Sequence, residues 1–113
     1  NLAIMPINTG VVMSIEDDII PGIFKLHQNY PNPFNPVTTL RYDLPKDGLV
    51  SITIYDMLGN VIKQLVNEVQ NSGHKSIQWN ATNSQGQPVS AGVYLYSIEA
   101  GDFRQTKKMI LLK

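Results

Sequence analysis

Two histidines and no cysteine limit the chemistry open to this chain of 113 residues. Without a thiol, a nucleophile would have to be a serine or threonine hydroxyl, with His27 or His74 as its general base. His74 starts an outward-facing strand after a glycine turn, and His27 lies just before a proline-rich segment. We interpret both as ordinary surface histidines, and we expect no catalytic residue and no enzymatic activity.

The acidic residues and the amides point to structure rather than to catalysis. Asp43, Asp47 and Asp56 fall at strand ends and turns, where aspartate forms local hydrogen bonds to the backbone. The polar loop at residues 79–88 offers neutral asparagine oxygens, whereas hard cations such as Ca²⁺ prefer carboxylates. We therefore expect asparagine side chains to cap this loop, and we expect neither a metal site nor a cofactor.

Composition excludes further classes of function. The formal net charge is zero, which argues against nucleic acid as a partner because phosphate binding needs a basic excess. No apolar run approaches the roughly 18 residues of a membrane span. The length suits one domain with a single core.

The elements that must position any functional surface begin with a proline-rich segment, Tyr30–Pro36, which we call the proline ribbon. Three prolines restrict the backbone here and push each preceding residue toward extended conformations. Tyr30 and Phe34 are aromatic residues that would pin this ribbon onto a core. We expect a ribbon without helix that leads directly into a strand.

Alternation of apolar and polar residues dominates the chain after the ribbon and predicts β-strands. One further stretch, Val61–Val66, has an ambiguous face assignment that indicates a bulge. With no helical period anywhere, we predict an all-β fold, an immunoglobulin-like antiparallel β-sandwich of about seven strands. The expected strands are Ile23–His27, Val37–Leu44, Val50–Tyr55, Val61–Val66, a short strand containing Ile77 and Trp79, Gly92–Ile98 and Phe103–Leu112.

Two aromatic residues are expected in the core of this sandwich. Trp79 is the natural core residue, and Tyr94 lies early in the penultimate strand, where a tyrosine corner would be. The first 22 residues show no clean period, apart from one short candidate strand at Gly10–Ile15. We interpret residues 1–22 as a linker or the remnant of an upstream domain, and residues 23–113 as the sandwich.

These features together resemble a known family. The proline ribbon and its continuation Val37–Pro45, the Gly92-x-Tyr94 element and the hairpin at Gly101 resemble the C-terminal sorting domain (type A) of proteins exported by the type IX secretion system. The same opening motif is found in the immunoglobulin-like domain of flagellar hook-capping proteins. The matching structural residues are Pro31, Asn32, Pro33, Phe34, Asn35, Pro36, Trp79, Gly92 and Tyr94. The family often has acidic residues after the tryptophan, where this chain has Asn80 and Asn83, so a calcium site is weakened further.

The resemblance implies a non-catalytic sorting or anchoring module. It would direct a secreted cargo protein across the outer membrane to the cell surface or the medium, with an outer-membrane shuttle, a sortase and the upstream cargo domain as partners. The implied recognition element is the C-terminal strand, on which we also expect an open edge, since lysines blunt an edge strand against self-pairing. Its residues are Lys107, Lys108, Met109, Ile110, Leu111, Leu112 and Lys113. That this strand ends the sequence favours the interpretation, because a sorting signal must be terminal.

Two other functions remain open. A carbohydrate-binding accessory domain of a secreted hydrolase would stack sugars on exposed aromatics, for which Tyr30, Tyr55 and Phe103 are candidates, although they are scattered. A structural domain like that of the hook cap would need further chain for assembly. Because one sandwich hosts many functions, the fold alone does not decide among these.

Overall fold

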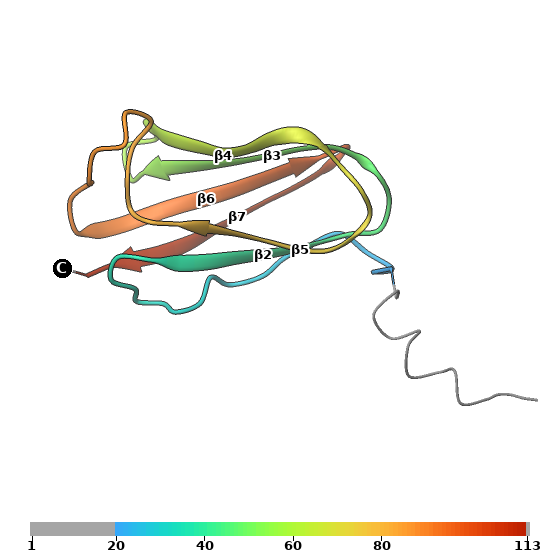
Figure 1. Ribbon diagram of the computed structural model, residues 1–113, viewed down its shortest axis with the longest axis horizontal. Coiled ribbons are helices and arrows are strands. Elements are labelled where there is room, and N and C mark those ends of the chain that lie inside the picture. The colour runs from blue at the N-terminus through green and yellow to red at the C-terminus, as the bar shows by residue number, and fades with distance from the viewer. Residues whose placement is uncertain (1–19, 113) are drawn as a thin grey trace, which may run out of the picture.

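The computed structural model describes residues 20–112 as seven strands and no helix (Figure 1). The candidate strand at Gly10–Ile15 and the last residue, Lys113, lie outside the described residues. No helix long and apolar enough to cross a membrane is found in residues 20–112. The strands are β1 (Lys25–Leu26), β2 (Thr38–Leu44), β3 (Gly48–Asp56), β4 (Val61–Gln70), β5 (Gly73–Trp79), β6 (Gly92–Ala100) and β7 (Phe103–Leu111).

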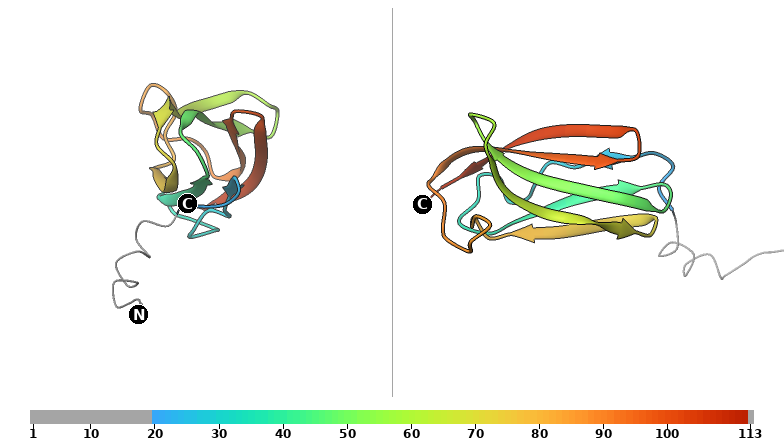
Figure 2. Two further views of the ribbon diagram at one scale, coloured as in Figure 1. Left: turned by 90° about the vertical axis from the view of Figure 1, so that its right-hand side faces the viewer. Right: turned by 90° about the horizontal axis from the view of Figure 1, so that it is seen from above.

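Two antiparallel sheets form the sandwich that the sequence predicts. The three-stranded sheet has the order β1-β2-β5, and the four-stranded sheet has the order β4-β3-β6-β7. The two layers enclose a single core, which is clearest when the molecule is viewed along its strands (Figure 2). The described chain enters at one end of the sandwich, and β7 ends at the other (Figure 1).

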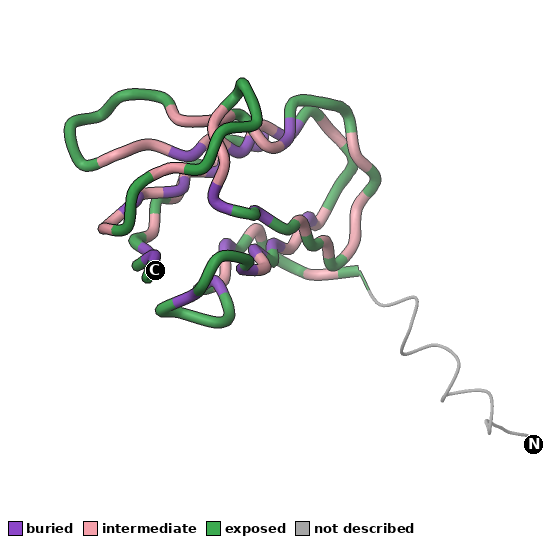
Figure 3. Tube along the Cα trace, turned by 60° about the vertical axis from the view of Figure 1, so that its left-hand side comes forward, coloured by how far each residue is buried: buried purple, intermediate pink, exposed green. Residues whose placement is uncertain are grey.

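Alternating burial along the strands follows the predicted pattern. In β2, Leu40, Tyr42 and Leu44 point into the core, and so does Thr38, which is fully buried. In β6, which lies between β3 and β7, one face is buried through Tyr94, Tyr96 and Ile98, and the apolar Val93 and Leu95 on the other face are half-buried. Buried positions consequently recur along the strands, whereas exposed positions gather in the loops (Figure 3).

The predicted bulge in β4 is confirmed. The register against β3 shifts between Ile52 and Thr53 and again between Ile54 and Tyr55, so that Leu65 and Ile62 have no partner on β3. Both of these unpaired residues pack against the core. The two bulges therefore let consecutive apolar residues of β4 reach the interior, which is the reason for the ambiguous face assignment in the sequence.

The first strand is shorter than expected. We expected Ile23–His27, but the strand comprises Lys25 and Leu26, opposite Asp43 and Tyr42, followed by one bond from the His27 N–H to the carbonyl oxygen of Arg41 at 2.9 Å. The partner strand ends at Leu44, and the next residue, a proline, has no amide hydrogen with which to extend the ladder. The side chain of Ile23 is consequently exposed.

Candidate recognition surface

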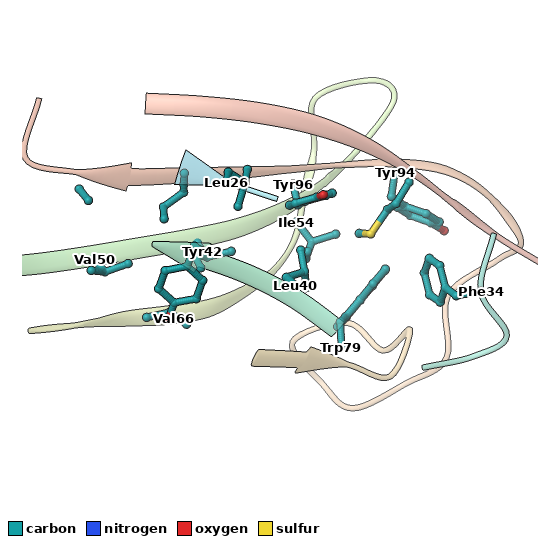
Figure 4. Packing of buried hydrophobic residues seen from close by; sticks show 14 of the residues in the cluster. Leu26, Phe34, Leu40, Tyr42, Val50, Ile54, Val66, Trp79, Tyr94 and Tyr96 are labelled. Atoms are coloured by element: carbon teal, nitrogen blue, oxygen red, sulfur yellow. The ribbon is translucent and has the colours of Figure 1, made fainter. Parts of the chain in front are cut away.

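An aromatic cluster anchors the proline ribbon at the end of the sandwich where β7 ends. Phe34 is 1% exposed, and its ring lies 5.9 Å from that of Trp79, which in turn meets Tyr94 edge-on at 5.5 Å. These three side chains come from the ribbon, β5 and β6 and converge in the core (Figure 4). The expected packing of Phe34 against the sandwich is thus confirmed, and residues 31–36 contain no helix.

The polar tips of this cluster are satisfied by the backbone. The Trp79 indole Nε1 donates to the carbonyl oxygen of Thr82 at 2.9 Å, and the Tyr94 hydroxyl donates to the carbonyl oxygen of Ser90 at 2.6 Å. Burial raises the pKa of the Tyr94 hydroxyl, and nearby Asp56 raises it further. The expected burial of both aromatic residues and the expected backbone bond of Tyr94 are confirmed, so a tyrosine corner is present.

A second anchor, not apparent in the sequence, holds the start of the ribbon. Asn29 is 2% exposed, and its amide nitrogen Nδ2 donates to the Thr38 hydroxyl and to the carbonyl oxygen of Pro31. The Tyr96 hydroxyl accepts from the Asn29 backbone N–H at 2.8 Å and donates to the carbonyl oxygen of His27 at 2.7 Å. Burial raises the pKa of Tyr96 to about 12, against the opposing effect of the Asn29 hydrogen bond, so this hydroxyl keeps its proton at neutral pH.

The prediction that Tyr30 pins the ribbon through its ring is wrong. The side chain of Tyr30 is 75% exposed, and its contribution comes from the backbone. Its N–H donates to the carbonyl oxygen of Thr39 at 3.0 Å, and its own carbonyl oxygen accepts from the Thr39 N–H at 2.9 Å. Tyr30 thus forms an isolated antiparallel bridge to β2, and its ring faces solvent while the side chain of the preceding residue, Asn29, is buried.

The ribbon lies against β7 and covers the outer edge of its last residues. The Phe34 N–H donates to the carbonyl oxygen of Ile110 at 3.0 Å, and the Leu112 N–H donates to the carbonyl oxygen of Phe34 at 2.8 Å. The side-chain oxygen Oδ1 of Asn32 accepts from the Ile110 N–H at 3.0 Å, and Gln28 Nε2 donates to the carbonyl oxygen of Lys108 at 2.8 Å. Met109, Ile110 and Leu111 pair with β6 as expected. The expectation of an open edge at the end of β7 is wrong, because the ribbon is hydrogen-bonded to it.

The lysines of the C-terminal strand point to different sides. Lys107 shares its side of β7 with the buried Met109, whereas Lys108 shares its side with the exposed Ile110. Arg104, near the start of the strand, forms an exposed ion pair with Glu99 at 3.4 Å. The structure therefore does not gather the basic residues into one patch on the described part of β7.

The loop after Trp79 is held by its own side chains. Asn83 Oδ1 accepts from the N–H groups of Gln85 and Gln87, both at 3.0 Å, and the Thr82 hydroxyl donates to Asn80 Oδ1 at 2.6 Å. The predicted capping by asparagine is confirmed. Within residues 20–112, no group of three histidine, cysteine or acidic side chains is arranged to hold a metal ion.

One cluster of titratable groups was missed from the sequence. On the outer face of the three-stranded sheet, Asp43 accepts from His27 Nε2 through Oδ2 and from His74 Nδ1 through Oδ1, both at 2.9 Å. Burial raises the pKa of Asp43, but the hydrogen bonds and charges of His74 and His27 outweigh it and hold the pKa below its usual value. The interpretation of both histidines as ordinary surface residues is therefore wrong for His27, whose side chain is only 28% exposed, and incomplete for His74.

This cluster does not assemble a nucleophile. Ser76 lines the same shallow cleft, but within the described residues its hydroxyl has no hydrogen bond to either imidazole. The carboxylate instead ties the segment after β1 and the start of β5 to β2, whose residue Asp43 pairs with both neighbouring strands. Its arrangement supports a structural clasp.

The candidate sugar-binding aromatics are also separated. Tyr55 pairs with Leu95 near the middle of β6, whereas Phe103 pairs with Ala100 at the end of β6 and stacks on Phe24 at 5.2 Å. An open cleft of about 330 Å³ lies near Phe24, between the turn before β3 and the hairpin between β6 and β7. The structure does not bring Tyr30, Tyr55 and Phe103 together into a platform.

Comparison with protein families matches residues 28–112 to a model described as a secretion system C-terminal sorting domain. The match begins just before the proline ribbon and includes the strand that the ribbon covers. A comparison with curated proteins finds no match.

Solved structures with a similar fold include parts of PorU and PorZ and the hook-capping protein FlgD. Dimeric latent PorU from Porphyromonas gingivalis is 23% identical with a TM-score of 0.60, over 83% of this chain and 10% of PorU. PorZ is described as an essential bacterial surface component of the type-IX secretion system of P. gingivalis. It is 21% identical with a TM-score of 0.54, over 80% of this chain and 11% of PorZ. FlgD from Xanthomonas campestris is 20% identical with a TM-score of 0.55, over 89% of this chain and 74% of FlgD. The chain thus spans about a tenth of PorU and of PorZ, and at these identities the likeness concerns the fold.

Proposed function

This chain belongs to the family of secretion system C-terminal sorting domains, and we propose that it directs an attached cargo protein across the outer membrane by type IX secretion. The observation that carries the proposal is the family match over residues 28–112. The cargo would be delivered to the cell surface or released to the medium. Residues 1–22 would connect the domain to that cargo.

A sorting domain acts by being recognised, so it requires a stable surface rather than a reactive group. The aromatic cluster and the ribbon support such a surface, because they fix the end of β7 through both packing and backbone hydrogen bonds. The partners would be an outer-membrane shuttle and a sortase. The domain itself would be non-catalytic, and the clasp formed by Asp43 and two histidines fits a structural role.

A reporter fusion tests the proposal directly. A fluorescent protein that folds in the periplasm is placed before residue 1, and the fusion is expressed in a host with a working type IX system. The intact domain should deliver fluorescence to the cell surface or the medium, whereas deletion of residues 108–113 should leave it in the periplasm. Lys113→Ala is the milder variant, because it removes one charged side chain and no core residue.

Two outcomes separate sorting from the alternatives. If the intact fusion remains periplasmic while an unrelated sorting domain exports the same reporter, the sorting proposal is wrong. Binding of the purified domain to insoluble polysaccharide would then favour an accessory role in a secreted hydrolase.

A further inference from the structure

The covered edge of β7 restricts how a partner can read the C-terminal strand. Strand addition needs unpaired N–H and C=O groups along an edge. Near the end of β7, however, Ile110 and Leu112 already bond to Asn32 and Phe34 of the ribbon. A partner strand would have to displace a ribbon that is anchored in the core by Phe34.

The side chains on the outer face remain accessible. Successive residues of a strand point to opposite faces, so Lys108, Ile110 and Leu112 lie on the side away from the core. Ile110 is 37% exposed and Leu112 is 50% exposed. The end of the chain that the structure describes therefore presents one basic and two apolar side chains to solvent on this side.

The neighbouring strands continue this apolar surface. Ile110 of β7 pairs with Val93 of β6, and Lys108 of β7 pairs with Leu95 of β6. On its other side Leu95 pairs with Tyr55 of β3, which in turn pairs with Val61 of β4. Val61 is 61% exposed. We call this set the apolar corner; it comprises Tyr55, Val61, Val93, Leu95, Lys108 and Ile110.

Two polar rows of the same face separate the corner from Leu49 and Val69, an exposed apolar pair at the far end of β3 and β4. The next row across the four strands is formed by Gln64, Thr53, Ser97 and Thr106. The row after that is formed by Asn67, Ser51, Glu99 and Arg104, the last two being joined as an ion pair. The corner is therefore the apolar part of this face that extends across all four strands and includes residues of β7, and contiguous exposed apolar residues of this kind are typical of a contact surface.

We propose that the export machinery reads the folded domain through the apolar corner, and not through the edge of β7. This inference rests on the proposed sorting function. The partner would be a protein surface that is apolar at its centre and carries a carboxylate opposite Lys108. A protein fits better than an anionic membrane, because attraction to such membranes takes clusters of about four to eight cations and the corner offers one.

Substitutions outside the last strand provide the sharpest test. Tyr55→Thr combined with Leu95→Thr removes two apolar side chains from the corner and replaces them with a β-branched residue that favours strands. Neither position lies within residues 107–113, so a loss of export would show that a folded surface is read rather than a terminal sequence. The matched control, Ser97→Thr with Thr106→Ser, changes the polar row of the same face.

The readout is the ratio of exported to periplasmic reporter. We expect the corner variant to lower this ratio about tenfold or more, and the control to leave it unchanged. Lys108→Glu, which changes only an exposed charge, should also lower it, whereas Lys46→Glu at the opposite end of the sandwich should not. Circular dichroism and thermal melting of the purified variants check that each remains folded.

If a partner instead reads the edge of β7, loosening the ribbon should raise export, and substitutions in the apolar corner should leave export unchanged. Asn32→Ala removes the acceptor for the Ile110 N–H and should leave export unchanged if the corner is read. The proposal is overturned if this variant raises export, or if the folded corner variant is exported as well as the intact domain. The purified domain is also sedimented with phosphatidylglycerol vesicles. If the intact domain binds the vesicles and the corner variant does not, the proposal of a protein partner is overturned. Failure of the intact domain to export would instead refute the sorting function itself.

Discussion

Replacing Phe34 by alanine tests whether the proline ribbon is an integral part of the fold. The side chain is 1% exposed and packs on Trp79, while its backbone bonds to Ile110 and Leu112 hold the Cα position beside β7. Because the ribbon cannot readily close over the space, a cavity cost adds to the lost transfer free energy. We expect a loss of about 3–4 kcal/mol in the free energy of unfolding, against a total of roughly 5–15 kcal/mol for a domain of this kind.

Urea unfolding followed by tryptophan fluorescence measures this loss, because Trp79 is the one tryptophan of the chain and lies beside Phe34. Phe103→Ala is the matched control. It makes the same chemical change at a partly buried ring that stacks on Phe24 at the other end of the sandwich. We expect the control to cost less, about 1–2 kcal/mol, because less area is returned to water.

Amide hydrogen exchange gives a second, local readout of the same substitution. The Ile110 and Leu112 N–H groups bond to the ribbon rather than to β6, so both should exchange faster in the Phe34→Ala protein. A cost no larger than that of Phe103→Ala, with the protection of these two amides unchanged, would show that Phe34 does not anchor the ribbon.

Three further predictions follow from the core, the loop and the carboxylate clasp. Trp79→Ala should cost about 3–5 kcal/mol in urea unfolding followed by circular dichroism, whereas Tyr94→Phe, which loses only the bond to Ser90, should cost about 1 kcal/mol; equal costs would contradict the assigned roles. Ala81 is buried with a φ of 62°, so Ala81→Gly relieves backbone strain while losing a methyl group. It should cost clearly less than Ala100→Gly, a change at a buried strand position where φ is negative, and an equal cost would be inconsistent with strain. The folded-state pKa of Asp43 lies below its unfolded value, so its contribution to stability is present above about pH 4 and is lost as the pH falls through the folded pKa. Asp43→Asn should therefore be less stable than the parent at pH 7 and approach it in strong acid; a constant difference at every pH would argue against the clasp.

The features that the sequence predicts are those set by local periodicity. Alternation in β2 and β6 identifies the buried faces, and two consecutive apolar pairs in β4 indicate the bulges that turn Ile62 and Leu65 inward. The tyrosine corner is predictable because Tyr94 and its acceptor Ser90 lie only four residues apart. Each of these depends on neighbours along the chain, or on one strand and its face.

What the sequence does not reveal depends on which segments fold back onto one another. Asn32 and Ile110 are 78 residues apart, so the cover over the edge of β7 has no local signature. The same holds for Asp43, whose two imidazoles come from segments on either side of β2. An isolated Asn-Pro pair indicates a turn, but whether its side chain caps a distant strand is decided by tertiary packing.

The union of ribbon and last strand also determines how truncations of this domain should be interpreted. Removing residues 108–113 deletes Met109 and Leu111 from the core, at 0% and 1% exposed, and leaves Phe34 and Asn32 without their backbone partners. A loss of export after truncation would therefore report unfolding as readily as loss of a signal. Substitutions at Tyr55 and Leu95 avoid this ambiguity because they change the outer face without touching the ribbon, the aromatic cluster or the edge of β7.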